Sequence, residues 1–405
     1  MGLVVQKFGG TSVANAERIH RAARRAIRAK LEGHRVVVVV SAMGKTTDEL
    51  IDLANQVTSA PPKREMDMLL TTGEQISIAL MAMAIDAAGH EAISFTGGQV
   101  GLVTDASHTK ARIKKIDADR IHEELKAGRI VIVAGFQGIT EDGAITTLGR
   151  GGSDTTAVAL AAALKADACE IYTDVDGVYT TDPRIVPQAK KIEKISYDEM
   201  LELASLGAGV MHSRAIEFGK KYDVPIHVRS SLTDTPGTMI ITETPEMEEI
   251  VVRGATLKKD LARVFLMGVP NKPGVAARIF ARIAKHNIAV DDIIQNVSQD
   301  GNVANIGFTT GATDAKEAQA VCQEIGKEIG FAKVESDEKV AKVSIVGVGM
   351  KTHTGVAAKM FNALADAKVN IGNISTSEIV ISCIVDRADA EKALKAVHAA
   401  FELDK

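Results

Sequence analysis

The chain up to about residue 240 alternates short runs rich in valine and isoleucine with longer segments of helical periodicity. This alternation is typical of an α/β fold in which helices sandwich a largely parallel sheet. The expected strands are 3–6, 36–41, 92–95, 130–135, 169–174 and 225–229. The expected helices are 15–32, 47–58, 65–88, 117–127, 153–165 and 197–221. Parallel strands end at one edge of a sheet, so we expect a ligand site in the loops that follow them.

Beyond a linker-like stretch at 230–250, rich in Ser, Thr, Pro and Gly, the sequence repeats itself. The segment around Gly274 is echoed around Gly355, 81 residues later. A second echo, at Asn287 and Asn370, is offset by 83 residues. Each copy shows the order strand, helix, strand, strand, helix, strand, which is the split βαβ arrangement. The sequence therefore predicts two ferredoxin-like βαββαβ modules after the larger domain.

The expected domain boundary lies near residue 245. We assign 1–245 to the larger domain and 246–405 to the two modules. The first module covers about 264–338 and the second about 341–405, with a strand within 249–262 as a candidate to complete the second. Two such modules can pack side by side and hold a small ligand at their shared edge, although a purely structural pair remains the alternative.

Composition excludes several classes of protein. Lys and Arg number 48 against 52 Asp and Glu, and there is no Trp, so neither a basic surface nor stacking aromatics favour nucleic-acid binding. No uninterrupted apolar run, including the strand-like Val36–Val40, approaches the ~18 residues of a membrane span, and we expect no membrane insertion. Met1 leads directly into a strand-like run, which predicts a cytoplasmic protein. The isolated Cys169, Cys322 and Cys383 predict buried thiols without a metal site.

The segment Lys7–Ser12, with the sequence Lys-Phe-Gly-Gly-Thr-Ser, follows a predicted strand and precedes a helix. Consecutive glycines let an oxyanion approach the backbone, and lysine adds a positive charge, so this segment predicts a phosphate cradle. Gly44-Lys45-Thr46 is similar to the end of a P-loop, but Val39 stands where that motif needs glycine. Ser41–Asp48 is instead a hydroxyl-rich loop after a strand, either a ligand loop or a polar loop without a partner.

Three further segments carry groups suited to an amino acid and a nucleotide. Glu74 stands beside a glycine, where its carboxylate can receive an ammonium group. Arg150, in Gly149–Thr156, can grip a carboxylate with two hydrogen bonds, and Asp154 lies at a predicted helix start. The loop Thr173–Arg184 offers hydroxyls, acids and an arginine for a nucleotide. A dehydrogenase reading of Gly347-Val348-Gly349 fails, because the third glycine position is occupied by threonine.

Taken together, these motifs resemble those of the aspartate kinase family, and the resemblance covers nearly the whole chain. Its later part, including Gln295–Ser298 and Ile374–Ile379, resembles two ACT modules. The resemblance implies an amino-acid-kinase catalytic domain that transfers the γ-phosphoryl group of MgATP to the β-carboxylate of L-aspartate, opening lysine, threonine and methionine synthesis. It further implies feedback by lysine, threonine or both through the ACT modules.

The resemblance also implies roles for individual residues. Lys7 and Asp154 would be the catalytic pair, with no general base, since a carboxylate is already ionised at neutral pH. The substrate-binding residues would be Thr47, Glu74, Arg150, Gly151, Gly152 and Ser153. The nucleotide would be bound by Lys7, Gly9, Gly10, Ser12, Ser41, Thr173, Asp174, Tyr179 and Arg184. Magnesium would arrive with ATP, without a dedicated set of protein ligands.

The effector site implied by the resemblance lies between the ACT modules. Its residues would be Asn271, Lys272, Pro273, Gly274, Val275, Asp291, Asp292, Gln295, Asn296, Thr354, Gly355, Val356, Asn370 and Ile371. From the residues alone, the two aspartates either receive a cationic group or form a solvated strand end.

The sequence also departs from the family pattern at several places. Gly209 stands where many members have lysine, so a cation near ATP is absent or supplied by Arg214 or another residue. In the second ACT module, Thr354, Gly372 and Val380 replace a proline, a more apolar residue and a lysine. We therefore expect an intact catalytic domain and a less typical regulatory region.

The exposed edges of ACT sheets predict a homo-oligomer. A start at Met247 would instead give a separate regulatory subunit of residues 247–405, as some family members produce. Two other functions remain open: a kinase for a different carboxylate or a carbamate, and a non-catalytic amino-acid sensor. Glu74 with Arg150 favours an α-amino acid over the first, and the presence of Lys7 with Asp154 argues against the second.

Overall fold

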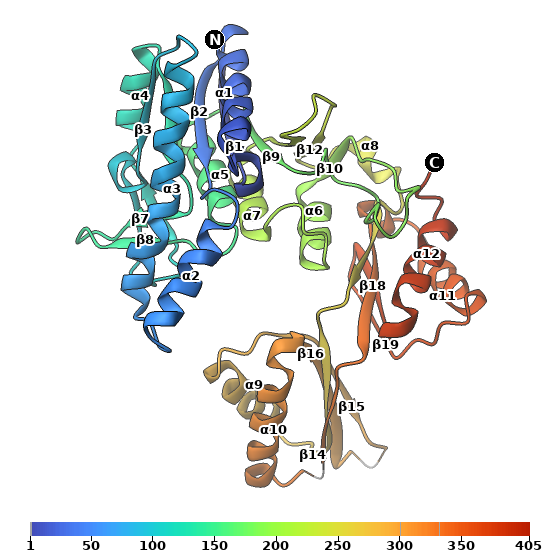
Figure 1. Ribbon diagram of the computed structural model, residues 1–405. Helices are drawn as coiled ribbons and strands as arrows, with labels where there is room; N and C mark the ends of the chain where they lie inside the picture. Colours follow the sequence, from blue (N-terminus) through green and yellow to red (C-terminus); the bar gives the residue numbers. More distant parts are fainter. Residues whose placement is uncertain (1, 300, 332) are drawn as a thin grey trace. The chain divides into compact units, whose positions relative to one another are not determined.

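In the computed structural model, which describes residues 2–299, 301–331 and 333–405, all six strands expected in the first part of the chain form and join one sheet (Figure 1). The eight strands lie in the order β10-β12-β11-β9-β1-β2-β6-β3. All neighbours are parallel except β11 and β12. The central strands are buried on both faces, which explains their continuous valine and isoleucine runs. The bounds are β1 Leu3–Phe8, β2 Arg35–Val40, β3 Ala92–Phe95, β6 Ile130–Ala134, β9 Ala168–Thr173, β10 Lys194–Ser196, β11 Ile226–Ser230 and β12 Thr238–Ile241.

Helices pack on this sheet, and two features differ from expectation. The helices are α1 Ala16–Leu31, α2 Thr46–Val57, α3 Lys63–Asp86, α4 Asp119–Lys126, α5 Gly152–Leu164, α6 Tyr197–Ser205 and α7 Ser213–Tyr222, with 3-10 turns η1 Gly10–Val13 and η2 Gly98–Val100. The single helix expected at 197–221 was wrong, because Gly207 has a φ of 117° and breaks it into α6 and α7. A second small sheet was missed; it comprises β4 Leu102–Thr104, β5 Ile113–Ile116, β7 Gln137–Ile139 and β8 Ile145–Thr147.

Helix α3 corrects the sequence-based argument about membranes. Among the described residues it is the one helix long and apolar enough, by length and composition, to cross a bilayer. Half of that apolar stretch is buried, and α3 also buries Asp67, Glu74 and Ser77 among the residues of the protein. A helix that buries carboxylates in this way has the pattern of a core helix.

The chain divides into two compact units. The first comprises the residues up to Tyr179, Lys191–Ser205 and Gly209–Met247. The second comprises Thr180–Lys190, Leu206–Ala208 and Glu248–Lys405. The short segment Thr180–Lys190 therefore leaves the first unit and belongs to the second.

The second unit contains the two expected ACT-like modules, each a four-stranded antiparallel sheet with two helices (Figure 1). The first has the strand order β15-β16-β14-β17 and the second β13-β18-β20-β19. Their strands are β13 Gly254–Lys258, β14 Ala262–Pro270, β15 Val290–Val297, β16 Val303–Thr310, β17 Lys333–Asp337, β18 Val340–Val346, β19 Asn373–Thr376 and β20 Val380–Asp386. The helices are α8 Pro245–Glu248 at the junction, α9 Val275–Lys285, α10 Ala315–Ile329, α11 Val356–Asp366 and α12 Ala390–Ala400, with η3 Ala312–Asp314, η4 Val348–Lys351 and η5 Arg387–Asp389.

The repeat seen in the sequence has a structural counterpart. Gly274 and Gly355 both cap the first helix of their module in a left-handed conformation, with φ of 86° and 83°. A glycine is favoured there because a side chain strains that conformation. The three cysteines are buried and free, which confirms that they are buried thiols.

Candidate active site

Four parallel strands bring the expected site residues to one edge of the large sheet. Strands β9, β1, β2 and β6 are consecutive neighbours, so Thr173, Phe8, Val40 and Ala134 end side by side. The loops that follow them include the glycine segment after β1 and the hydroxyl-rich loop after β2. This is the edge at which open α/β sheets bind ligands.

The centre of the site is an ion pair between Lys7 and Asp154. The Nζ atom of Lys7 lies 2.5 Å from Oδ1 of Asp154, and both side chains are only 12–13% exposed. Lys7 comes from β1, and Asp154 lies in the first turn of α5, where the helix dipole favours negative charge. A Cβ at Gly9 would lie 3.4 Å from Nζ, so glycine leaves the ammonium group accessible. The two residues expected to form the catalytic pair are therefore in contact.

The glycine segment serves two purposes. A Cβ at Gly10 would lie 2.9 Å from the carbonyl oxygen of Ala42, so only glycine permits this close approach of the two loops. The amide of Gly9 donates to the carbonyl of Tyr172, and Ser12 is buried at 3% exposure with its hydroxyl directed to the same carbonyl. Lys7 and Gly10 thus face the pocket, whereas Gly9 and Ser12 hold the loop against β9.

Glu74 on α3 is a buried carboxylate with one oxygen unpartnered. Its Oε1 accepts a hydrogen bond of 3.1 Å from the amide of Ala42, while Oε2 is buried without a hydrogen-bond partner. Burial raises the pKa of Glu74 to about 7, against the opposing effect of the Ala42 amide. A Cβ at Gly73 would lie 2.8 Å from that of Ala42, so this glycine lets α3 approach the loop. An unsatisfied buried carboxylate oxygen in a pocket is suited to receive a cationic ligand group.

The segment Gly149–Asp154 forms the opposite wall. Gly149 and Gly151 have φ of 76° and 69°, and the turn between them presents Arg150 to solvent. The resulting pocket of about 290 Å³ also contains Ser153 and Asp154 from the start of α5. It is lined by Lys7, Gly10, Ser41, Ala42, Gly44, Thr47, Glu74, Phe136, Gly149, Arg150, Gly151, Gly152, Ser153 and Asp154. Every expected substrate-binding residue therefore lines this one pocket.

The sequence analysis did not identify Phe136, which lines the pocket, or Asp67, which supports one of its loops. Phe136 lines the pocket and has a φ of 69°. It lies two residues after the end of β6, and loops that follow parallel strands commonly bind ligands, so this position was the signal that could have revealed it. Asp67 is completely buried; it accepts hydrogen bonds from Thr147 and from the amide of Thr109, and it contacts His108 at 2.7 Å. Gly149 packs against the carbonyl of Thr109. Asp67 therefore anchors the segment that supports Gly149–Asp154, which we call the arginine loop.

Arg214, which the sequence offered as a substitute cation near ATP, has a different place. Its guanidinium group donates to the carbonyl oxygens of Leu148, at 2.8 Å, and Ala111, at 2.7 Å. Burial and the neighbouring Arg112 lower the pKa of Arg214. Both hydrogen bonds are to backbone carbonyl groups, and Leu148 directly precedes Gly149. Arg214 therefore stabilises the arginine loop.

We therefore expect Arg214→Met to raise about tenfold the KM for the carboxylate substrate that the sequence analysis placed at Arg150, because two hydrogen bonds from a charged donor to backbone carbonyl groups are lost. The KM for the expected nucleotide should change less than twofold. Arg214→Lys should recover part of the loss, since lysine replaces one donor but not the fork. Steady-state kinetics with each substrate varied would test this, and an equal rise in both KM values would contradict it.

The expected nucleotide-binding residues are divided between the two units. Thr173, Asp174 and Tyr179 belong to the first, and Arg184 belongs to the second. The hydroxyl of Thr173 donates to Asp174, and that of Tyr179 donates to Asp176 at 2.8 Å. Arg184 contacts Asp182 through a two-pronged interaction, with distances of 2.8 Å and 3.0 Å.

The expected effector residues of the second unit lie in loops, on β15, and at the first positions of α9 and α11, where Val275 and Val356 stand. Asp291 and Asp292 both pair with the buried ammonium group of Lys342, but the side chain of Asp291 is still 64% exposed, whereas that of Asp292 is 12% exposed. The Lys342–Asp291 distance is 2.9 Å, and Lys342 is 3% exposed. The sequence analysis missed this lysine, which joins β18 of the second module to β15 of the first.

Comparisons with known proteins agree with this architecture. Residues 2–230 match the profile of the amino acid kinase family, and residues 263–329 and 343–401 each match an ACT domain. The fold and pocket thus define an amino acid kinase followed by two ACT domains.

Relatives that match over the whole chain indicate which family of amino acid kinases it belongs to. The chain is 54% identical to aspartokinase 2 of Bacillus subtilis, covering 100% of this chain and 99% of that one. It is 53% identical to an aspartate kinase of Pseudomonas putida, covering 100% of this chain and 98% of that one. The chain belongs to the aspartokinase family, and it is therefore an enzyme.

Solved structures agree as well. Escherichia coli aspartokinase III in complex with aspartate and ADP, described as the R-state, superposes with a TM-score of 0.83 at 28% identity, covering 98% of this chain and 99% of that one. The same enzyme with lysine and aspartate, described as the T-state, gives a TM-score of 0.80 at 28% identity, with the same coverage.

Proposed function

We propose that this enzyme transfers the γ-phosphoryl group of ATP to the β-carboxylate of L-aspartate, giving 4-phospho-L-aspartate. The observation that carries the proposal is the Lys7–Asp154 ion pair in a pocket that also contains Glu74 and Arg150. The fold and family support it, since the E. coli relative is described with aspartate and ADP.

The roles follow from charge. Arg150 holds the α-carboxylate of aspartate, and Glu74 receives its α-ammonium group, which leaves the β-carboxylate to react. Lys7 neutralises charge on the transferring phosphoryl group, while Asp154 orients the lysine. Phosphoryl transfer depends mainly on positioning and charge neutralisation, and the acceptor carboxylate is already ionised, so no general base is needed.

We propose that Mg²⁺ enters with the nucleotide. Among the described residues, no group of three His, Cys, Asp or Glu side chains is arranged to hold a metal ion. Magnesium commonly retains water and binds substrate phosphates with one or two carboxylates, so this donor set is compatible with MgATP. Near the glycine segment, Asp174 is the candidate carboxylate, and its partner Thr173 keeps it oriented.

The direct test is ATP-dependent formation of aspartyl phosphate, trapped as the hydroxamate with hydroxylamine. Lysine and threonine should be added singly and together. Product formation with inhibition by either or both amino acids would support the kinase and its regulation. Product without inhibition would restrict the proposal to catalysis and point to Thr354, Gly372 or Val380 as marks of an altered effector site. Absence of product would overturn the proposal in favour of the amino-acid sensor.

We propose that the ACT domains bind the pathway end products lysine or threonine, and that the reaction opens lysine, threonine and methionine synthesis. The E. coli relative is described with bound lysine, which supports lysine as one effector. An effector can inhibit only if it binds the inactive arrangement more tightly than the active one. Because Asp291 and Asp292 pair with Lys342, an effector's ammonium group would share the exposed Asp291 with this lysine, displace the lysine, or bind to Gln295 and Asn296 instead.

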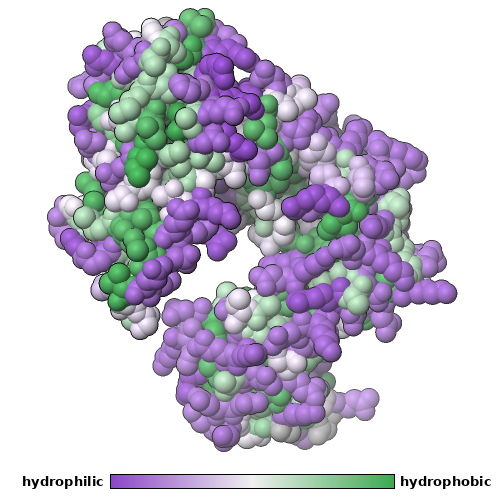
Figure 2. Space-filling view, viewed as in Figure 1, coloured by the Kyte–Doolittle hydropathy of each residue, from purple (hydrophilic) through white to green (hydrophobic). Residues whose placement is uncertain are grey.

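The enzyme is proposed to act as a homo-oligomer. Strands β15 and β19 are at the edges of their sheets, and Ile293, Val297 and Ile374 on them are exposed. Unpaired edges with apolar side chains favour pairing with a second chain. Figure 2 shows a further set of exposed apolar side chains in the first unit, where α2 and α3 lie; they include Leu53, Val57, Ile76, Leu80 and Met83.

An internal start at Met247 would yield a separate regulatory subunit. Expression of the natural gene should then give an additional species of about 17 kDa, the share of the 42.9 kDa chain that residues 247–405 represent. Changing the Met247 codon to leucine should remove this species, because initiation there is lost. An immunoblot against the C-terminal region would measure both, and the absence of the short species from the unaltered gene would contradict the hypothesis.

We also propose a cytoplasmic location. Three buried, unpaired cysteines suit a reducing compartment, and ATP and aspartate are cytoplasmic metabolites. Fractionation of cells with an antibody to the enzyme would test this.

A further inference from the structure

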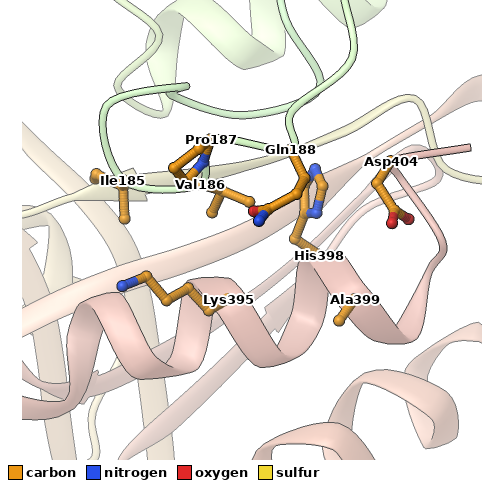
Figure 3. Close-up of a pocket in the computed structure, with 8 residues that line it drawn as sticks. All are labelled: Ile185, Val186, Pro187, Gln188, Lys395, His398, Ala399 and Asp404. Carbon is orange, nitrogen blue, oxygen red and sulfur yellow. The ribbon is translucent and has the colours of Figure 1, made fainter.

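The segment Thr180–Lys190 is built into the second ACT module. Val186 is buried in the hydrophobic core of that module, and Ile185 packs against the same core. Figure 3 shows Ile185, Val186, Pro187 and Gln188 facing His398 and Ala399 of α12 across a pocket of about 420 Å³. This segment directly follows Tyr179 and contains Arg184, both of which the family resemblance assigns to nucleotide binding.

Thr180, at the start of the segment, has every polar atom hydrogen-bonded. Its amide donates to the carbonyl of Lys190 at 2.9 Å, and its carbonyl accepts from the amide of Ala255 at 2.7 Å. Its hydroxyl lies 3.0 Å from the amide of Lys190, 2.9 Å from the carbonyl of Leu403 and 3.1 Å from Nε2 of His398. Thr180 and His398 are 8% and 2% exposed.

The hydroxyl network permits only one arrangement of protons. A threonine hydroxyl has one donor and two acceptor sites. The carbonyl of Leu403 can only accept, so it takes the hydroxyl proton, and the amide of Lys190 can only donate. His398 must then donate from Nε2, so that nitrogen carries a proton in this arrangement. Burial lowers the pKa of His398, which favours the neutral ring over the doubly protonated one.

We propose that Thr180 is a positioning residue for the nucleotide, which fixes Tyr179 and Arg184 through its bonds to His398 and Leu403 of the second ACT module. The proposal rests on the proposed kinase function. Three of the five hydrogen bonds to Thr180 come from the ACT module, through Ala255, His398 and Leu403. A shift of α12 therefore moves the start of the segment that bears Arg184. ATP affinity should consequently depend on residues at the end of α12.

The first variants remove hydrogen bonds of this network without large changes in side-chain shape. Thr180→Val retains the branched side chain but loses all three hydroxyl bonds, and His398→Leu removes the ring donor. We expect each to raise the KM for ATP and the Kd for a non-hydrolysable ATP analogue about tenfold, with the KM for aspartate changed less than twofold. Thr180→Ser keeps the hydroxyl and should have wild-type KM and Kd values for the nucleotides. His398→Gln should show a smaller increase than His398→Leu, since its amide can donate from a similar place.

Lys395→Ala provides the matched control. Lys395 lies on α12 and lines the same pocket, but its side chain is exposed (Figure 3). This variant should leave both KM values unchanged. Thermal unfolding of all variants would identify any that fail to fold.

A second measurement does not depend on catalysis or nucleotide binding. Hydrogen exchange of full-length Thr180→Val should be faster in 174–190 than in the wild type and unchanged in α5. Faster exchange together with the selective loss of ATP affinity would support the proposal. Unchanged exchange in 174–190, or an equal loss for both substrates, would overturn it while wild-type product formation still upheld the kinase function. If the wild type bound no nucleotide, the kinase proposal would fail, and exchange alone would decide whether Thr180 fixes the segment.

Discussion

Replacing Lys7 with alanine is expected to lower kcat by a factor of about 10²–10³, equivalent to ~3–4 kcal/mol of transition-state stabilisation. The reason is the place of its ammonium group, 2.5 Å from Asp154 in a pocket where both side chains are largely buried. A preorganised positive charge in such a place neutralises the phosphoryl oxygens better than solvent does. Hydroxamate formation at saturating ATP and aspartate would measure the loss.

Two controls separate catalysis from folding in this experiment. Lys126→Ala changes an exposed lysine on α4 and should leave kcat unchanged. The far-ultraviolet circular dichroism spectrum of Lys7→Ala should match that of the wild type, since β1 has its own backbone pairing on both sides. A folded Lys7→Ala enzyme with wild-type turnover would remove Lys7 from the mechanism.

Elements defined by local patterns could be predicted from the sequence. The buried strands β1, β2 and β6 were found because a parallel strand covered on both faces needs continuous apolar residues. The paired glycines 274 and 355 were found because their φ requires the same residue in both modules. Among the pocket residues, Lys7, Gly10 and Ser41 were found at the ends of neighbouring parallel strands, whereas Glu74 on α3 and Arg150 before α5 were found from their motifs and the family resemblance.

Features that depend on distant partners could not be predicted in this way. Arg214 was one candidate for a cation near ATP, and only its contacts with Leu148 and Ala111 show which groups it binds. Lys342 lies in an apolar strand, and nothing local shows that it pairs with two aspartates 50 residues away. The segment Thr180–Lys190 reads as part of the first domain, because chain order does not show which core buries Val186. In each case the long-range partner determines the role.

Glu74→Gln is expected to raise the KM for aspartate about 50-fold, equivalent to roughly 2–3 kcal/mol, because a buried charge pair with the substrate ammonium is replaced by a neutral hydrogen bond. Ala42 keeps its hydrogen-bond acceptor in this variant, so the loop should remain in place. Glu65→Gln, an exposed change on the same helix, is the matched control and should have no effect. Steady-state kinetics with aspartate varied would measure the change.

The same carboxylate should make aspartate capture depend on pH. With its pKa raised to about 7, Glu74 is increasingly protonated below that pH and loses its attraction for an ammonium group. In the wild type, kcat/KM for aspartate should fall as pH decreases from 8 to 6. In Glu74→Gln, kcat/KM should be low and should change little over the same pH range. An equally steep profile in Glu74→Gln would show that another group titrates.

Stability should change in the opposite direction, which distinguishes a binding role from a structural one. The pKa of Glu74 is higher in the folded state than the 4.5 usual for a glutamate side chain, so the folded protein binds more protons between pH 4.5 and about 7. The free energy of unfolding therefore decreases as pH rises through this window, by roughly 3 kcal/mol in total. Above pH 7 the ionised carboxylate destabilises the fold, and Glu74→Gln should raise the Tm at pH 8 but not at pH 5. A variant that loses aspartate affinity while gaining stability at pH 8 would show that the unpartnered Oε2 is retained for the ligand, whereas a loss of both would assign Glu74 to the support of the Ala42 loop.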